Sequence, residues 1–126
     1  MKLIPILLFA LTLLFVGCSL LPPKFDATEY AEIVGLVTLA EIPNCEVTQV
    51  ERLHTQSRFT RNYARHLPDN EETFQSLREI NESVEALLVR VKTETIVSPT
   101  YCRMKYSNIE LMTHTLLDVV GRKPRR

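Results

Sequence analysis

An all-α fold is predicted: an up-down-up-down four-helix bundle that follows a cleaved lipoprotein signal peptide. Apolar residues recur every three or four positions in four successive segments, which is the spacing of one helix face. Short breaks that carry Pro43, Pro68 and Pro99 separate these segments. Because short connections make consecutive helices antiparallel neighbours, the four segments are expected to form a single bundle.

Residues 1–17 are interpreted as a signal peptide and are set apart from the fold. Lys2 precedes an apolar run from Leu3 to Val16, which is shorter than the roughly 20 residues that span a bilayer. The run ends in Phe15-Val16-Gly17-Cys18, which resembles the bacterial lipobox except that Phe15 replaces the usual leucine. The resemblance implies cleavage before Cys18 and acylation of its sulfur and its new amine. An ordinary secretory signal or an uncleaved anchor is the alternative.

Residues 18–25 are expected to tether the folded domain to the membrane. Pro22-Pro23 favours an extended, semi-rigid spacer. In enterobacterial lipoproteins an aspartate after the cysteine favours the inner membrane, so by resemblance Ser19 indicates the periplasmic face of the outer membrane. The inner membrane is the alternative location.

The helical domain is expected to span residues 26–121. Asp26-Ala27-Thr28-Glu29 has the form of a capping box at the start of the first helix, and Pro43-Asn44 ends that helix. The second helix is predicted over residues 45–67. Its predicted buried side consists of Val47, Val50, Leu53, Ser57, Thr60, Tyr63, Ala64 and Leu67. This side contains few large apolar residues, so it is the least apolar of the four.

The third helix is predicted to begin with the capping signal at residues 69–72 and to fade near residues 95–97. Its apolar positions form a heptad seam: Leu77, Ile80, Val84, Leu87 and Val91. A short strand over residues 89–97 is the alternative there. Ser98-Pro99 predicts the start of the fourth helix, and Gly121 predicts its end.

Cys45 opens the predicted second helix and Cys102 lies in the first turn of the fourth. In an up-down-up-down bundle these two helices start at the same end, so the topology brings the two cysteines to one level. An exported chain enters an oxidising compartment, which predicts a Cys45–Cys102 disulfide. Two free, buried cysteines are the alternative.

The balanced charge of 15 basic and 15 acidic residues conceals an uneven distribution. Residues 122–126 carry four of the basic side chains, and residues 18–121 carry ten basic against 15 acidic ones. The terminal segment is interpreted as a basic tail, either a solubilising end or a contact for anionic lipid or peptidoglycan. The lack of a net basic excess argues against a nucleic-acid partner.

His54, Arg58, Arg61 and Arg65 are spaced to form one stripe on the second helix. This basic stripe is expected either to pair with the glutamates of the third helix or to bind an acidic partner segment. A second candidate partner surface consists of Leu36, Leu39 and Ile42, which lie away from the main stripe of the first helix, or else belong to the core.

No enzyme, cofactor or metal site is predicted. The sequence contains no His-Glu-x-x-His, phosphate-binding glycine loop or Gly-x-Ser-x-Gly motif. Neither Cys45 nor Cys102 has another cysteine or a histidine at metal-ligand spacing.

The layout of Cys18, Cys45, Cys102 and the apolar face of residues 30–40 resembles the small helical pilotins of type II secretion. That resemblance implies an outer-membrane lipoprotein that binds a segment of a protein partner. The chain also resembles small phage- and plasmid-encoded envelope lipoproteins, which implies a role in lysis, as an outer-membrane spanin, or in entry exclusion.

Overall fold

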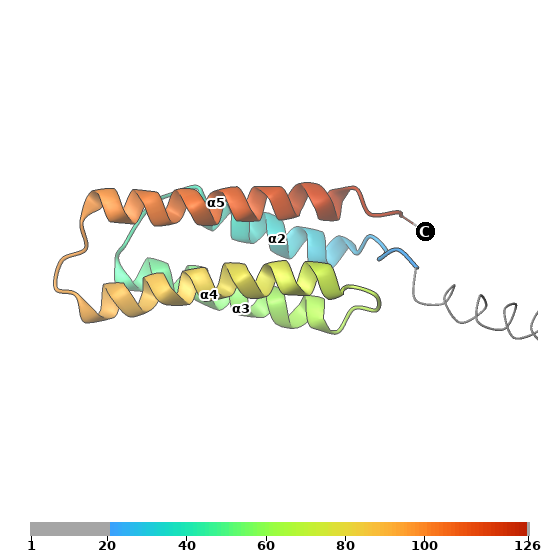
Figure 1. Cartoon of the computed structure of the whole chain (residues 1–126), viewed down its shortest axis with the longest axis horizontal. Coiled ribbons are helices and arrows are strands. Elements are labelled where there is room, and N and C mark those ends of the chain that lie inside the picture. The colour runs from blue at the N-terminus through green and yellow to red at the C-terminus, as the bar shows by residue number, and fades with distance from the viewer. Residues whose placement is uncertain (1–20, 126) are drawn as a thin grey trace, which may run out of the picture.

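The computed structural model describes residues 21–125 and shows four helices, with no strand among these residues. They are α2 (Ala27–Ala40), α3 (Val47–Arg65), α4 (Glu71–Thr93) and α5 (Pro99–Gly121). Each helix contacts the next along the chain, and α5 returns to contact α2, so the four close into a ring (Figure 1). The predicted all-helical four-helix architecture is confirmed.

The predicted signal peptide, the lipobox-like segment and Cys18 lie outside the described residues. Within residues 21–125, no helix has both the length and the apolar character needed to cross a membrane.

The local sequence explains where α2 and α5 begin, whereas Glu46 and Asn70, which precede α3 and α4, form no side-chain cap. The Asp26 carboxylate accepts a hydrogen bond from the Glu29 N–H at 2.7 Å, which caps α2. The Ser98 hydroxyl caps α5 in the same way by accepting from the Tyr101 N–H, and Pro99 occupies the first turn. Within residues 89–97 the predicted helix is confirmed as far as Thr93, where α4 ends, and the alternative strand is not formed.

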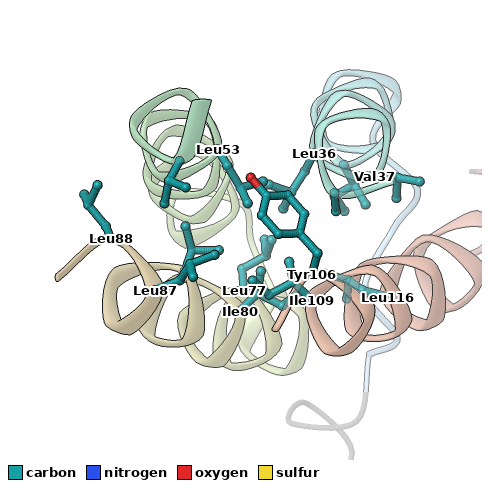
Figure 2. Close-up of a cluster of buried hydrophobic side chains, with 14 of the residues drawn as sticks. Leu36, Val37, Leu53, Leu77, Ile80, Leu87, Leu88, Tyr106, Ile109 and Leu116 are labelled. Atoms are coloured by element: carbon teal, nitrogen blue, oxygen red, sulfur yellow. The ribbon is translucent and has the colours of Figure 1, made fainter. Parts of the chain in front are cut away.

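The core lies along the axis of the bundle and receives side chains from all four helices. Figure 2 shows the ring of Tyr106 between Leu36 of α2 and Leu53 of α3, above the apolar side chains of α4. The Tyr106 hydroxyl donates to the Asn44 carbonyl at 2.6 Å, which satisfies the polar end of an otherwise buried ring. Burial raises the pKa of Tyr106 above its usual value.

The two ends of the bundle differ in the groups that they contain. At one end, which we call the disulfide end, Cys45 and Cys102 are bonded with their Cα atoms 6.0 Å apart, and this confirms the predicted pairing. The opposite end, which we call the tether end, contains the start of α2, the turn between α3 and α4, and the end of α5 (Figure 1). Asp69 adopts φ 55° in that turn, a left-handed conformation that aspartate tolerates better than most residues.

Candidate binding groove

A groove lies between α4 and α5 on the surface of the described bundle. Its volume is about 530 Å³, within the range of about 300–1,000 Å³ that is typical of ligand sites. Buried Ile80 of α4 and Leu116 of α5 line it together with the partly buried Met112. Pro23 and Lys123 also line it, which places the groove toward the tether end.

The groove exists because the facing side chains are small where α4 and α5 run past each other. Thr73 and Ser76 of α4 and Thr115 of α5 line it. These side chains are too short to interdigitate across the space, and α4 makes far fewer contacts with α5 than with α3. The space between the two helices is therefore left open to solvent.

The two rims of the groove differ in chemistry. On α5 the rim is apolar, because Leu111 is 68 % exposed and Val119 is 54 % exposed. Helical spacing predicts one apolar face for this helix, made of Cys102, Tyr106, Ile109, Met112, Leu116 and Val119, and the exposure of Val119 corrects that prediction. On α4 the rim consists of exposed Glu72, Ser76 and exposed Glu79. The apolar surface thus extends out of the groove on one side and meets carboxylates on the other.

Lys123 forms the end of the groove and belongs to a buried polar cluster. Its ammonium group donates to Glu29 Oε2 at 2.8 Å and also to Asn70 Oδ1. The Asn70 amide donates in turn to Glu29 Oε1 and to the Ala64 carbonyl. The side chains of Lys123 and Glu29 are only 4 % and 0 % exposed. We call Glu29, Asn70 and Lys123 the tether-end cluster.

The terminal segment is therefore not the free basic tail that was predicted. The Pro124 carbonyl accepts from the Phe25 N–H at 2.9 Å, and the Arg125 guanidinium lies 4.7 Å from the centre of the Phe25 ring. Together with the burial of Lys123, these contacts hold the C-terminal segment against the start of the domain. The positive charge of Lys123 is neutralised inside the protein. Arg122 and Arg125 are the exposed basic residues in the described part of this segment.

The predicted partner surface on α2 is corrected by the structure. Leu36 is 0 % exposed and belongs to the core, because α3 and α5 both pack against α2 and cover that side. Leu39 is partly buried and packs against the same core. Ile42 alone of the three lies well exposed, in the loop that follows α2.

Hydrogen bonds also join the weakly apolar α3 to its neighbours α2 and α4. The amide of Gln56 donates to the Glu32 carboxylate of α2 at 2.7 Å, and the Tyr63 hydroxyl donates to Asp26 at 3.1 Å. The Asn81 amide of α4 donates to the buried Ser57 hydroxyl at 2.8 Å. Hydrogen bonds thus add to the apolar packing of Val50 and Leu53 along α3, and the groove lies between two other helices.

The residues of the predicted basic stripe differ in burial and in the groups they contact. Arg61 is half-buried and donates to the Asn81 side chain at 2.7 Å, whereas Arg58 and Arg65 are exposed. Burial lowers the pKa of His54 from its usual value, an effect that nearby Glu85 opposes. The ion pair that joins α3 to α4 is Lys92–Glu51, at 2.7 Å, so the expected pairing with α4 glutamates does not involve this stripe.

The described residues offer little for metal or proton-transfer chemistry. Within residues 21–125, no group of three or more histidine, cysteine or acidic side chains is arranged to hold a metal ion. His114 pairs with Glu41 at 3.1 Å on an exposed surface rather than with Asp118, which lies near Arg122. The groove lining combines an apolar floor with hydroxyl and carboxylate groups, a combination that is suited to binding.

The sequence contains a weak signal for the groove. Leu111 falls outside the main apolar stripe of α5, and an apolar residue off the stripe marks an unpartnered face. No comparable signal existed for Lys123, because it follows the stop at Gly121 and looks like part of a charged tail.

Comparison of the chain with protein-family models, with curated proteins and with solved structures finds no significant match.

Proposed function

We propose that this chain is a non-enzymatic, lipid-anchored binding module of the bacterial envelope, attached through Cys18 at the periplasmic face of the outer membrane. Its α4–α5 groove receives an apolar segment of an envelope protein. The observation that supports this function is the groove itself: an apolar floor, an apolar rim with exposed Leu111 and Val119, and a volume typical of ligand sites. Such a surface is costly to leave in water and is characteristic of interaction sites.

The position of the groove fits a membrane-anchored assembly role. Pro23 lines the groove and lies five residues after Cys18. A fully extended chain of that length reaches roughly 18 Å at most. A lipid on Cys18 therefore keeps the groove close to the membrane surface, where it meets segments of proteins that insert in or approach that membrane.

The test uses paired substitutions of exposed apolar residues in the lipidated protein, expressed in a Gram-negative host. Leu111→Asp places a charge on the groove rim, and Phe59→Asp places the same charge at a 55 % exposed site on α3 that does not line the groove. A photo-crosslinking amino acid at position 115 reports contact with a protein.

We expect one discrete crosslinked envelope protein, lost in the Leu111→Asp variant and retained with Phe59→Asp, while circular dichroism shows both variants folded. Equal crosslinking in the two variants would refute the groove as the binding site. Radiolabelled palmitate incorporation that persists after Cys18→Ala would refute the anchor.

A further inference from the structure

The asymmetry of the groove rims indicates which kind of protein segment the groove accepts, if the proposed function holds. Glu72 and Glu79 are exposed on the α4 rim, and neither forms an ion pair within residues 21–125. By contrast, the neighbouring Glu82 of α4, which does not line the groove, lies 3.8 Å from Arg78. The two carboxylates that face the groove are thus available for a partner that occupies it.

No basic residue of the groove competes for these carboxylates. Lys123 is the one cation among the described residues that line it, and its ammonium group is held by Glu29 and Asn70 in the tether-end cluster. The α5 rim contributes Leu111, Thr115 and Val119, which carry no charge. The groove therefore presents a negative potential along one side only.

The spacing of the rim residues matches a helix. Glu72 and Glu79 are seven residues apart on α4, which corresponds to about 10.5 Å along the axis. A helix that lies along the groove presents its own residues i and i+7 at the same separation and on the same side. On the other side, Leu111, Thr115 and Val119 repeat every four residues, which suits the apolar face of an amphipathic helix.

We propose that the groove binds a cationic amphipathic helix of an envelope protein. Its apolar face packs between Ile80, Leu116 and Leu111, and two lysine or arginine residues two turns apart pair with Glu72 and Glu79. Because these pairs lie on an exposed rim, they fix the register and orientation of the helix, and most of the affinity comes from the apolar face.

The experiment measures binding of designed peptides to the whole processed lipoprotein in nanodiscs of neutral phosphatidylcholine, with empty nanodiscs as the background. Three fluorescent 18-residue peptides share one leucine face and carry lysine, glutamine or glutamate at two flanking positions, i and i+7. Anisotropy gives Kd at low salt and at 0.5 M NaCl.

At low salt we expect the lysine peptide to bind about 2- to 30-fold more tightly than the glutamine peptide, and the glutamate peptide to bind most weakly. The preference should shrink in high salt because rim charges are screened. E72Q with E79Q should abolish the preference, so that this variant binds the lysine and glutamine peptides equally. E82Q with E85Q, the matched control on the same helix, should preserve the preference.

Other outcomes separate the two proposals. Equal binding of the lysine and glutamine peptides, both lost with Leu111→Asp, would overturn the cationic-helix inference and leave the groove function standing. Binding of a fluorescent fatty acid in place of every peptide would also overturn the inference, as would a dimer detected by light scattering that Leu111→Asp dissociates. Peptide binding that Leu111→Asp does not change would refute the groove itself.

Discussion

Lys123→Met is expected to destabilise the protein strongly, although it replaces the fourth residue from the end of the 126-residue sequence. The substitution keeps an unbranched side chain that is one atom shorter and removes the ammonium group that bonds to Glu29 at 2.8 Å and to Asn70. The Glu29 side chain is 0 % exposed, so its carboxylate is left in the interior without a counter-charge. Breaking a buried pair in this way costs about 3–5 kcal/mol.

That loss is large beside the total stability of a small domain, which is about 5–15 kcal/mol. Urea unfolding at pH 7, followed by circular dichroism and extrapolated linearly to water, measures it. Arg122→Met is the matched control, because the neighbouring Arg122 side chain is 83 % exposed and its loss should change stability by no more than about 0.5 kcal/mol.

A double-mutant cycle isolates the ion pair from the effects of packing. Adding Glu29→Met to Lys123→Met removes the unpaired charge, so the double variant should be more stable than Lys123→Met alone. The reasoning is refuted if Lys123→Met and Arg122→Met unfold at the same urea concentration, since Lys123 would then be an exposed residue of a tail.

Two further predictions concern the core and the disulfide end. Replacing Cys45 and Cys102 together with serine should lower stability by about 4 kcal/mol, because the bond closes a loop across a sequence separation of 57 residues; an unchanged urea midpoint, with and without reductant, would contradict this. Tyr106→Phe should cost about 0.5–1.5 kcal/mol at pH 7 by removing the bond to the Asn44 carbonyl. The pKa of Tyr106 is higher in the folded protein than in the unfolded chain, where it is about 10. Protonated Tyr106 therefore contributes its full stabilisation below about pH 10, and this contribution is lost as the pH rises through the folded pKa. Tyr106→Phe should therefore make the alkaline stability profile flatter, and a profile parallel to that of the wild type between pH 9 and 11 would argue against this role.

The pattern of the chain was sufficient to predict the helices. Pro43, Pro68 and Pro99 mark the breaks, and the second helix, predicted over residues 45–67, is observed as Val47–Arg65. Such differences of two residues at helix ends are ordinary, because terminal turns lack half of their hydrogen bonds. The disulfide followed from topology, since helices of the same direction begin at the same end.

The partners of the Glu29 side chain could not be predicted from the local sequence. Its position three residues after Asp26 predicts a capping box, and the Asp26 half of that box is present. The Glu29 side chain instead bonds to Lys123 and Asn70, residues 94 and 41 positions away along the chain. A capping motif describes only its own turn, and it contains no information about a distant ammonium group that competes for the same carboxylate.

By itself, the sequence determined the number of helices, their order and direction, the pairing of Cys45 with Cys102, and the helix starts at Asp26 and Ser98. These features depend on local spacing and on the antiparallel rule, both of which can be read along the chain. The tertiary structure alone decided that Leu36 is core, that Lys123 is buried, and that the open groove lies between α4 and α5. Those outcomes depend on how side chains from separate helices fill a shared volume, and helical periodicity identifies the apolar face of a helix without specifying which neighbour covers it.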